Sequence, residues 1–555
     1  MPGTTRAIVQ VCVGISATLC SLSAAGQATQ TAPLPPASTA ASGQETSSPA
    51  PPRPAPALTP EQRAFQDANR IQDPVQKLDA LRKVQADLKG SAAAFTVRQV
   101  DEAILWHLVA QFRDRRDDIA SAFNQVSDGQ AKSPEAQLLL LPTITSRLLD
   151  NQIILGEAET ELARLVASVK PSTDALRTAR GRAFEALGRI HVEQGHADKA
   201  SEELKTALET NPSLTRAPIL LAEIEAKRGN NGVALDYYLL ATVSGRMKSA
   251  EEAAMRALYR RVRGSDGDLE AELDRVYDKH FSNPISPKKY QPATGSRRVA
   301  VLELFTGSAC APCVSADLSW DAVLVRYPEN VIAPLAYHAH IPGPDPMVVP
   351  GGDARRLYYE VRGVPTFNVN GALARVGGGS RDGASRTYDA YVTAIDKALA
   401  RAPAAEVQIH AERSGSKVNV VAKASGLPAG ASDLRLHVVL AERHLAFSGE
   451  NGIRHHAMVV RSVAGDKGSG IPIRGASDTT VDHSFDLDLI RSEVENSVAD
   501  EIARRVKTRA ASATPPDYRA DGRAMGTINP DALVVVAFVQ DASKNVLQAA
   551  RADVK

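Results

Sequence analysis

A pattern of small and large residues that recurs after 34 residues constrains the fold of this chain more than any other feature. Ala200 and Leu204 in the first copy correspond to Ala234 and Tyr238 in the second. Small residues let the two helices of a hairpin approach closely, and the large residue fills the seam between them. The pattern therefore predicts stacked pairs of helices. The matching positions are Leu187, Gly188, His191, Gly195, Ala200, Leu204, Ala207 and Pro212, then Leu221, Ala222, Glu225, Gly229, Ala234, Tyr238 and Ala241.

These positions resemble the tetratricopeptide repeat. The surrounding residues 59–285 are rich in Ala and Leu with helical periodicity, so we expect one helical domain over this range. Stacks of this kind need about three units or more, and helices near 75–88 and 97–113 are expected to complete the stack. The resemblance implies that the domain binds a protein partner on a concave face. A helical spacer that packs against the next domain is the alternative.

The N-terminal segment has the pattern of a secretory signal. Arg6 precedes an apolar stretch, and Ser23-Ala24-Ala25 supplies small residues for cleavage. We therefore expect removal of residues 1–25 and a periplasmic or extracellular protein, with an uncleaved N-terminal anchor as the alternative. Residues 26–58 are rich in Pro, Ala and Ser and predict a disordered linker. No later segment has the composition of a membrane span.

The charge balance bears on the class of partner. The chain carries 65 Lys and Arg residues against 64 Asp and Glu residues, a formal net charge of +1, and no basic block. A balance of this kind provides no positive field for nucleic acid or an anionic membrane. We therefore expect protein partners and no nucleic acid.

Two cysteines carry the chemistry that the sequence predicts. Cys12 and Cys20 lie in the expected signal segment, so Cys310 and Cys313 remain as the only thiols of the mature chain. In an oxidising compartment they can pair only with each other or with another molecule. At a helix start the first thiol would ionise readily and the second would lie one turn away, as thiol–disulfide exchange requires. A zinc site would need further ligands, and no second cysteine pair exists.

The sequence around the cysteines predicts alternating strands and helices. Val299–Phe305 is an apolar run typical of a buried strand, and a helix begins at the cysteine motif. A second buried strand is expected at 331–337, and a third at 363–371, which starts at a proline and ends at an Asn-Gly turn. A last helix is expected at 384–400.

This order, with Gly-Val-Pro-Thr before the third strand, resembles the thioredoxin superfamily over residues 296–400. The phrase Glu-Leu-Phe-Thr before the motif is similar to a secreted branch of that superfamily. The resemblance implies that Cys310 is the nucleophile and Cys313 the resolving thiol. It also implies a cis peptide bond between Val364 and Pro365, in a loop that binds the substrate chain. An ordinary trans proline at the start of an edge strand is the alternative.

Glu303 is the candidate proton acceptor for Cys313, because a buried carboxylate can take up a proton from a thiol. The resemblance implies a buried acid one position later, where Leu304 stands. A strand residue that faces solvent is therefore the alternative for Glu303. Ala309 and Ala311 replace residues that are common in the superfamily, which leaves the reduction potential and the substrate open.

Two histidines offer a different chemistry. His338 and His340 alternate along the second predicted strand or its exit, so both can lie on one face. Together with the two cysteines they would form a copper site, as in thioredoxin-like copper chaperones. Loop histidines without a metal are the alternative, which we favour, and the sequence calls for no cofactor.

The C-terminal region alternates apolar and polar residues with period two. The expected strand faces are Val418/Val420, Leu434/Leu436/Val438/Leu440 and Leu533/Val535/Ala537/Val539, each made of apolar residues at alternate positions. Short strands separated by turns predict an immunoglobulin-like β-sandwich over 403–555. A helix is expected to interrupt it at 487–507.

The sequence therefore predicts a multidomain protein with a helical repeat domain, an α/β thioredoxin-like domain and a β-sandwich. We expect an exported thiol–disulfide oxidoreductase that acts on protein thiols or disulfides and holds an unidentified protein partner through its repeats. A non-catalytic scaffold with a static disulfide is the main alternative, and copper handling is the second. The sequence leaves open the direction of electron flow, because the relative stability of thiolate and disulfide decides it.

Overall fold

The computed structural model describes residues 58–89, 94–130, 133–245, 247–291, 297–429, 431, 433–465, 468–475, 477–508 and 527–555. The expected signal segment and all but the last residue of the expected linker lie outside the described residues. The described chain forms two compact units that divide after Gln130. The first unit is helical, and the second contains helices together with all of the described strands.

Capping residues set the starts of the first two helices. The side chain of Thr59 accepts a hydrogen bond from Gln62 N at 3.2 Å, and that of Asp73 accepts one from Gln76 N at 2.8 Å. A proline follows each cap, where its missing N–H is not needed. The helices expected near 75–88 and 97–113 are present, but they belong to the first unit and not to the unit that contains the matched repeats, so the single helical domain expected over 59–285 divides after Gln130. The described helices of this unit are α1 (Pro60–Arg70), α2 (Pro74–Asp87), α3 (Ala94–Gln111) and α4 (Arg116–Gln130).

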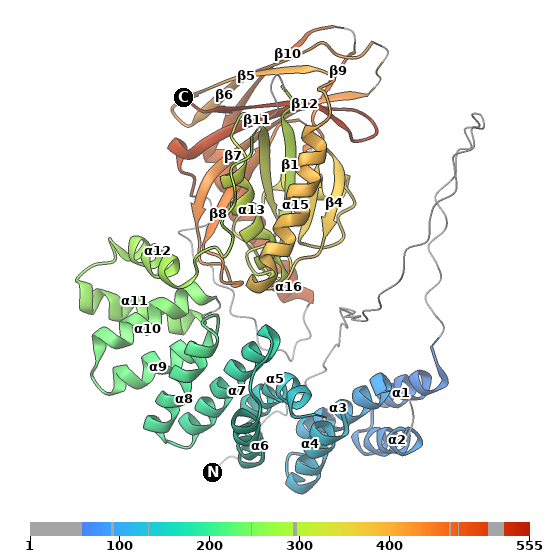
Figure 1. The fold of residues 1–555 in the computed structure, drawn as a ribbon, viewed down its shortest axis with the longest axis vertical. Helices are drawn as coiled ribbons and strands as arrows, with labels where there is room; N and C mark the ends of the chain where they lie inside the picture. Colours follow the sequence, from blue (N-terminus) through green and yellow to red (C-terminus); the bar gives the residue numbers. More distant parts are fainter. Residues whose placement is uncertain are drawn as a thin grey trace, which may run out of the picture. The chain divides into compact units, whose positions relative to one another are not determined.

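The second unit begins with helices that pack in consecutive pairs (Figure 1). The helix pairs α7–α8 and α9–α10 correspond to the two matched copies of the sequence pattern. α5 and α6 pack against α7 on one side, and α11 and α12 each pack against α10 on the other, so helices continue the stack beyond the two matched copies. The bounds are α5 (Pro134–Asn151), α6 (Leu155–Ser168), α7 (Asp174–Glu193), α8 (Ala197–Thr210), α9 (Arg216–Lys227), α10 (Asn231–Ser244), α11 (Ser249–Arg263) and α12 (Leu269–His280).

The close approach predicted from the small residues is present between α7 and α8. A Cβ atom on Gly188 would lie 2.6 Å from Leu204 Cγ and 3.3 Å from the backbone oxygen of Ala200. Ala200 and Leu204 have no exposed surface. The absence of a side chain at Gly188 therefore allows the two helices of this hairpin to pack at this distance.

A single mixed sheet forms the centre of the C-terminal region. Its strands lie in the order β12-β11-β7-β8-β2-β1-β3-β4, and β9 pairs with β7. β1 runs parallel to β2, and β2 runs parallel to β8, whereas the other neighbours are antiparallel. The bounds are β1 (Ala300–Thr306), β2 (Ile332–His338), β3 (Thr366–Val369), β4 (Ala372–Val376), β7 (Leu434–Ala446), β8 (His455–Val463), β9 (Ile471–Ile473), β11 (Leu533–Gln540) and β12 (Val546–Asp553).

The expected boundary near residue 403 does not separate two sheets. β8 pairs with β2 through Ala336 and Val459, so strands from 403–555 extend the sheet that contains β1. The indole N–H of Trp320, on the helix after the cysteines, donates to Ala457 O at 3.0 Å and joins the same regions. β8 thus lies beside an edge of β2 that would otherwise have no neighbouring strand.

A second, three-stranded sheet lies over part of the first. It consists of β5 (Glu406–Ser414), β6 (Lys417–Ser425) and β10 (Thr479–Asp486) in the order β10-β6-β5. Val418 and Val420 on β6 pack in one buried cluster with Leu436 on β7 and Val535 on β11. The predicted strand faces are thus present, and the two sheets pack on each other at these strands. The larger sheet, however, continues from β7 through β8 into β2 and β1.

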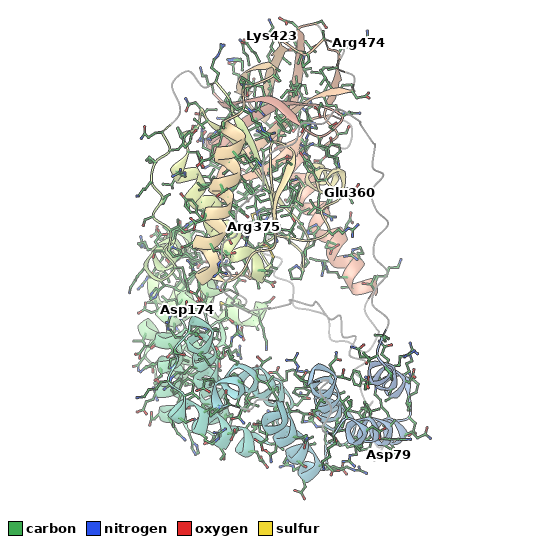
Figure 2. All side chains as sticks on the ribbon, turned by 45° about the vertical axis from the view of Figure 1, so that its right-hand side comes forward. Asp79, Asp174, Glu360, Arg375, Lys423 and Arg474 are labelled. Atoms are coloured by element: carbon green, nitrogen blue, oxygen red, sulfur yellow. A yellow bond between two sulfur atoms is a disulfide. The ribbon has the colours of Figure 1, made fainter. Side chains whose placement is uncertain are left out.

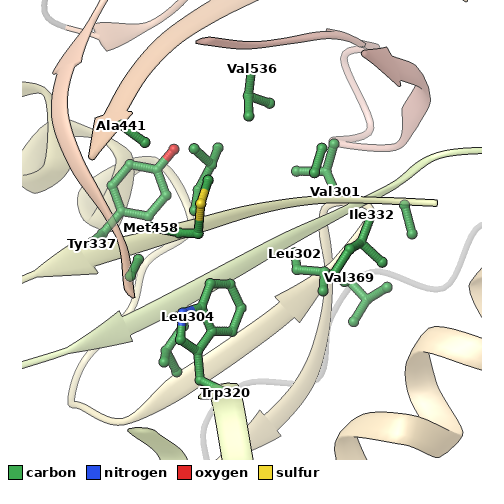
Figure 3. Packing of buried hydrophobic residues seen from close by; sticks show 14 of the residues in the cluster. Val301, Leu302, Leu304, Trp320, Ile332, Tyr337, Val369, Ala441, Met458 and Val536 are labelled. Atoms are coloured by element: carbon green, nitrogen blue, oxygen red, sulfur yellow. The ribbon is translucent and has the colours of Figure 1, made fainter. Parts of the chain in front are cut away.

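Helices cover both faces of the large sheet. α13 (Val314–Arg326) and α15 (Ala384–Leu399) lie on one face (Figure 1), and α14 (Pro350–Tyr358) packs against β2 and β8. Leu304 on β1 and Trp320 on α13 lie together in the core, as Figure 3 shows. α16 (Leu487–Thr508) follows β10, close to the helix expected at 487–507.

Charged side chains lie mostly at the surface. Asp79, Asp174 and Lys423 are exposed and point away from the ribbon (Figure 2). Among the described residues, the helices lack the combination of length and apolar character that a bilayer span requires.

Candidate functional site

The end of β1 and the start of α13 position the two cysteines. β1 ends at Thr306, and Cys310 precedes a short 3-10 turn, Ala311–Cys313, from which α13 continues. Cys310 N donates to Gly307 O at 3.0 Å, and Cys313 N donates to Cys310 O at 3.0 Å. Both cysteines therefore lie at a helix N-terminus, as the sequence predicts, where the helix dipole favours a thiolate.

Cys310 and Cys313 form a disulfide with a Cα–Cα distance of 5.3 Å. Cys310 is 2% exposed and Cys313 is 0% exposed, whereas Ala311 and Pro312 between them are exposed. The disulfide therefore lies just below the surface, and a partner can reach it only from the side of Cys310 or after a local movement.

The loop before β3 lies next to Cys310. The Val364–Pro365 peptide bond is cis, as the resemblance implied, and Val364 O is 3.7 Å from Cys310 Sγ. Val364 is partly exposed, whereas Pro365 is buried. The structure thus brings Cys310, Val364 and Pro365 together, and it leaves backbone groups of the loop close to the sulfur.

A glycine segment after β4 holds the cysteine turn from the other side. Gly379 N donates to Pro312 O at 2.8 Å, and Ser315 N donates to Gly379 O at 3.0 Å. A Cβ atom on Gly378 would lie 2.0 Å from Pro312 O and 2.8 Å from Pro365 Cγ. Only glycine can therefore occupy this position without moving the segment away from the disulfide.

Glu303 lies on the face of β1 that looks away from the first turn of α13. Side chains alternate along a strand, and Thr306, which has the opposite orientation, is the residue that bonds α13. Glu303 has no exposed surface, and Arg355 Nε donates to its Oε1 at 2.7 Å. Tyr359 Oη donates to Oε2 at 2.7 Å. The structure therefore places Glu303 in a buried ion pair rather than beside the cysteines.

The surroundings of Arg355 keep it charged. Burial alone would lower the pKa of this guanidinium, but Glu303 and the tyrosines Tyr359 and Tyr337 outweigh burial and raise it. The guanidinium also lies over the ring of Tyr359 at 4.6 Å and over that of Phe538 at 5.2 Å. These contacts join α14 to β1 and β11 in the interior of the sheet.

Asp317 is the acid that the sequence argument missed. It follows Cys313 by four residues, so the two side chains lie on one face of α13, one turn apart. Thr306 Oγ1 donates to Asp317 Oδ1 at 2.7 Å. Burial raises the pKa of Asp317 to about 7, although the bond from Thr306 and the nearby His338 ring act against it. The spacing of four residues after the second cysteine was the available signal.

A buried polar cluster continues from Asp317 to the loop after β2. Asp345 accepts hydrogen bonds from Ser308 N at 2.6 Å and Met347 N at 2.9 Å, and its Oδ2 lies 2.9 Å from His338 Nδ1. Burial would raise the pKa of Asp345, but the His338 ring and these bonds outweigh it and lower the pKa. Asp345 thereby fixes the segment that leads into the cysteine turn.

The two histidines of the copper alternative have different partners. His338 bonds Asp345, whereas His340 Nε2 lies 3.1 Å from Ser497 Oγ on α16 and its Nδ1 accepts from Asp345 N at 3.0 Å. The ring of His338 also contacts that of His456 edge-on, with centroids 5.3 Å apart. In the part of the chain that the structure describes, no group of three or more His, Cys, Asp or Glu residues is arranged to hold a metal ion.

The comparisons with known proteins bear on the repeats. No family model matches the chain. Tetratricopeptide repeat protein 29 of Macaca fascicularis is 27% identical over 159 residues, which cover 26% of this chain and 32% of that protein. The chain thus spans about a third of the relative that it matches. The helix pairs, their 34-residue period and this likeness identify tetratricopeptide-type repeats, which suit protein–protein interaction.

Solved structures show weaker likeness. HBP35 of Porphyromonas gingivalis has a TM-score of 0.32 and 13% identity, over 48% of this chain and 77% of that chain. Pseudomonas aeruginosa PilF has a TM-score of 0.27 and 16% identity, over 40% of this chain and 91% of that chain. PilW, a type IV pilus biogenesis factor, has a TM-score of 0.26 and 17% identity, over 41% of this chain and 96% of that chain. Likeness at this level says nothing about function.

Proposed function

We propose that this chain is an exported thiol–disulfide oxidoreductase of thioredoxin type whose repeats hold the protein on which it acts. The observation that carries the proposal is the Cys310–Cys313 disulfide at the start of α13, with the cis Val364–Pro365 loop 3.7 Å from Cys310 Sγ. Backbone groups of that loop are suited to pair with an extended substrate chain next to the reacting sulfur.

The exchange moves two electrons between protein thiols. In the oxidising direction a substrate thiolate attacks Cys310 Sγ, a mixed disulfide forms, and the Cys310–Cys313 bond breaks to leave a Cys313 thiolate. The second thiolate of the same substrate then attacks the substrate sulfur that is bonded to Cys310 Sγ. This attack closes the substrate disulfide and releases the Cys310 thiolate. The substrate gains a disulfide, and the chain gains two thiols after each thiolate takes up a proton. The reducing direction is the reverse sequence.

Asp317 supports the proton transfers in this proposal. A carboxyl group exchanges protons best when its pKa lies near the working pH, and the pKa of Asp317 is raised to about 7. Its place one turn after Cys313 suits it to give a proton to the Cys313 thiolate or to take one from the thiol. Glu303, with both carboxylate oxygens bonded by Arg355 and Tyr359, serves the packing of the sheet in this proposal.

The first test is turnover and trapping with the full mature chain. We expect the wild type to accelerate insulin reduction by dithiothreitol or oxidation of a dithiol peptide, and Cys310→Ser to abolish the acceleration. Cys313→Ser should accumulate a mixed disulfide between Cys310 and a partner, and the Cys310→Ser/Cys313→Ser double variant is the control. Equal rates for the wild type and Cys310→Ser would refute catalysis.

Burial of the sulfurs favours the second candidate, a scaffold with a static disulfide. Cys310 is 2% exposed, and the Gly378 segment packs directly against the turn between the cysteines. In this case the repeats carry the function, and thiol reagents should reduce the disulfide only as the protein unfolds. Reduction of the folded protein at a rate independent of denaturant would exclude the scaffold reading.

Export is part of the proposal and rests on residues outside the described structure. Arg6, the apolar stretch after it and Ser23-Ala24-Ala25 support cleavage after Ala25. The expected result is a secreted or periplasmic product whose mass lacks residues 1–25. An intact N-terminus in the exported fraction would favour the anchor instead.

A further inference from the structure

The loop between β7 and β8, residues 447–454, contacts the cysteine turn through Asn451. Asn451 N donates to Ser308 O at 3.0 Å. Its Nδ2 lies 3.3 Å from Gly307 O and 3.3 Å from Cys310 O, and it donates to both. One residue, 141 positions after Cys310, thus bonds three carbonyl groups of the segment that carries the nucleophilic cysteine.

The loop is itself held in a compact form. Phe447 N donates to Arg454 O at 2.8 Å, and Gly449 N donates to Ile453 O at 2.8 Å. Ile453 N donates to Asn451 Oδ1 at 3.1 Å, so both polar atoms of the Asn451 side chain are engaged. A Cβ atom on Gly449 would lie 2.7 Å from Ser308 O. The loop backbone therefore fits closely against the segment before the cysteines.

The other side of the loop fits against the end of α10. A Cβ atom on Gly452 would lie 2.8 Å from Ser244 O, and one on Gly245 would lie 2.9 Å from Glu450 O. Both glycines have positive φ angles, 77° and 143°. The backbones of the loop and of the repeat helix therefore meet without side chains between them.

Arg454 anchors the base of the loop to α12. This arginine is 1% exposed, and its Nε donates to Asp274 Oδ1 at 2.7 Å. Its Nη2 donates to Glu270 O at 2.9 Å and Glu270 Oε2 at 3.0 Å, and its Nη1 donates to Ser448 Oγ at 3.0 Å. A buried guanidinium with all these partners holds the loop firmly to the repeats.

We infer that Asn451 is a positioning residue for the Cys310–Cys313 pair and that α10 and α12, by holding its loop, help to set the equilibrium between disulfide and dithiol. When the S–S bond breaks, the two sulfurs separate to van der Waals distance, by side-chain rotation or by a shift of the segment with Cys310 or of the start of α13, and bonds to that segment oppose the shift. The bonds from Asn451 hold residues 307–310 in the conformation that the disulfide has, and they stabilise the oxidised form relative to the reduced form.

The linkage is reciprocal. If the repeats stabilise the disulfide through the loop, then reduction loosens the loop against Ser244 and Glu270 by the same free energy. A protein bound to α10 or α12 that favours one arrangement of the loop would shift the redox equilibrium. This inference rests on the site of the proposed function, but the equilibrium between disulfide and dithiol is measured without any substrate protein.

The experiment is a redox titration of the mature chain against mixtures of reduced and oxidised dithiothreitol. Reduced dithiothreitol gives two electrons and two protons to the disulfide and becomes its cyclic disulfide. Thiol alkylation followed by intact mass gives the fraction reduced. We expect Asn451→Ala to shift the equilibrium about three- to tenfold toward the dithiol, the size of one or two lost hydrogen bonds. The exposed Asn330→Ala is the matched control and should leave the equilibrium unchanged.

A second set of variants tests the part played by the repeats. Arg454→Gln should shift the equilibrium in the same direction as Asn451→Ala, and the double variant should shift it less than the product of the two, because both act through one loop. Arg491→Gln, which removes a surface pair with Asp488 on α16, is the control. Asp274→Asn, which removes one bond to Arg454, replaces Arg454→Gln if that variant fails to fold.

Two results would overturn the inference. An unchanged equilibrium in folded Asn451→Ala would remove Asn451 as a positioning residue. Fully multiplicative shifts, or no shift in Arg454→Gln and Asp274→Asn, would show that the repeats do not act on the disulfide equilibrium through this loop. Both are distinct from failure of the proposed function, because a protein without turnover still has a measurable disulfide equilibrium.

Discussion

Arg355 on α14 donates a 2.7 Å hydrogen bond from Nε to Oε1 of Glu303 on β1, and the side chains of the two residues are 1% and 0% exposed. The pair lies on the opposite face of β1 from Thr306, which bonds Asp317 near the disulfide. One face of this strand therefore serves packing, and the other serves the cysteine site.

Glu303→Gln should destabilise the protein strongly, because it leaves the Arg355 charge buried without its counter-charge. Breaking a buried pair in this way typically costs about 3–5 kcal/mol. The free energy of unfolding in urea measures the effect. Glu406→Gln, which removes an exposed carboxylate 3.8 Å from Arg297, is the control and should change stability by less than about 1 kcal/mol. Equal stability of the two variants would contradict the assigned role of the pair.

Asp317→Asn should flatten the dependence of stability on pH. The pKa of Asp317 is raised from 3.8 to about 7 in the folded chain, so unfolding releases a proton between these values. The contribution of Asp317 to the free energy of unfolding is therefore most favourable below about pH 4. As the pH rises to about 7, up to roughly 4 kcal/mol of this contribution is lost. The groups that face Asp317 are Thr306, His338, Asp345, Asn451, Asp321 and Tyr391.

Unfolding of the wild type and Asp317→Asn in urea at several pH values provides the measurement. The difference in stability between the two should move in favour of Asp317→Asn as the pH rises through this window. Asp389→Asn, an exposed change on α15, is the control. A difference that stays constant with pH would show that Asp317 is ionised as in water.

Gly188→Ala should destabilise the repeats. The new Cβ atom would lie 2.6 Å from Leu204 Cγ, and overpacking of this kind costs about 1–3 kcal/mol. Gly156→Ala on α6 is the matched control, because no atom lies within 4 Å of a Cβ there and alanine favours a helix. Thermal unfolding compares the two, and a lower midpoint for Gly156→Ala than for Gly188→Ala would contradict the packing argument.

Gly378→Ala should expose the disulfide. Its Cβ atom would lie 2.0 Å from Pro312 O, so the glycine segment must move off the cysteine turn. We expect faster reduction by a phosphine under native conditions, by roughly one order of magnitude, the effect of losing about 1–2 kcal/mol of local contacts. Gly383→Ala, where the nearest atom to the new Cβ is Ser315 Cβ at 4.0 Å, is the control. Equal reduction rates would show that this segment does not shield the sulfurs.

Local patterns predicted the elements of this chain well. The 34-residue period predicted the helix pairs α7–α8 and α9–α10, because the small residues that allow close packing lie at fixed positions within each copy. Apolar residues at alternate positions predicted the strand faces of β6, β7 and β11, since successive side chains point to opposite sides, and β11 is buried on both of its faces. Neither pattern contains information about which distant element becomes the neighbour.

The sequence by itself determined the repeats, the cysteine pair at a helix start and the strands on either side of them, since each leaves a pattern within a short segment or, for the repeats, one that recurs after 34 residues. Only the tertiary structure decided that β8 pairs with β2 through Val459 and Ala336, that Glu303 pairs with Arg355, and that Asn451 reaches Cys310 O. These contacts join residues 52 to 141 positions apart. Their partners are chosen by burial and by the need of buried polar groups for hydrogen bonds, and a local sequence pattern does not record that choice.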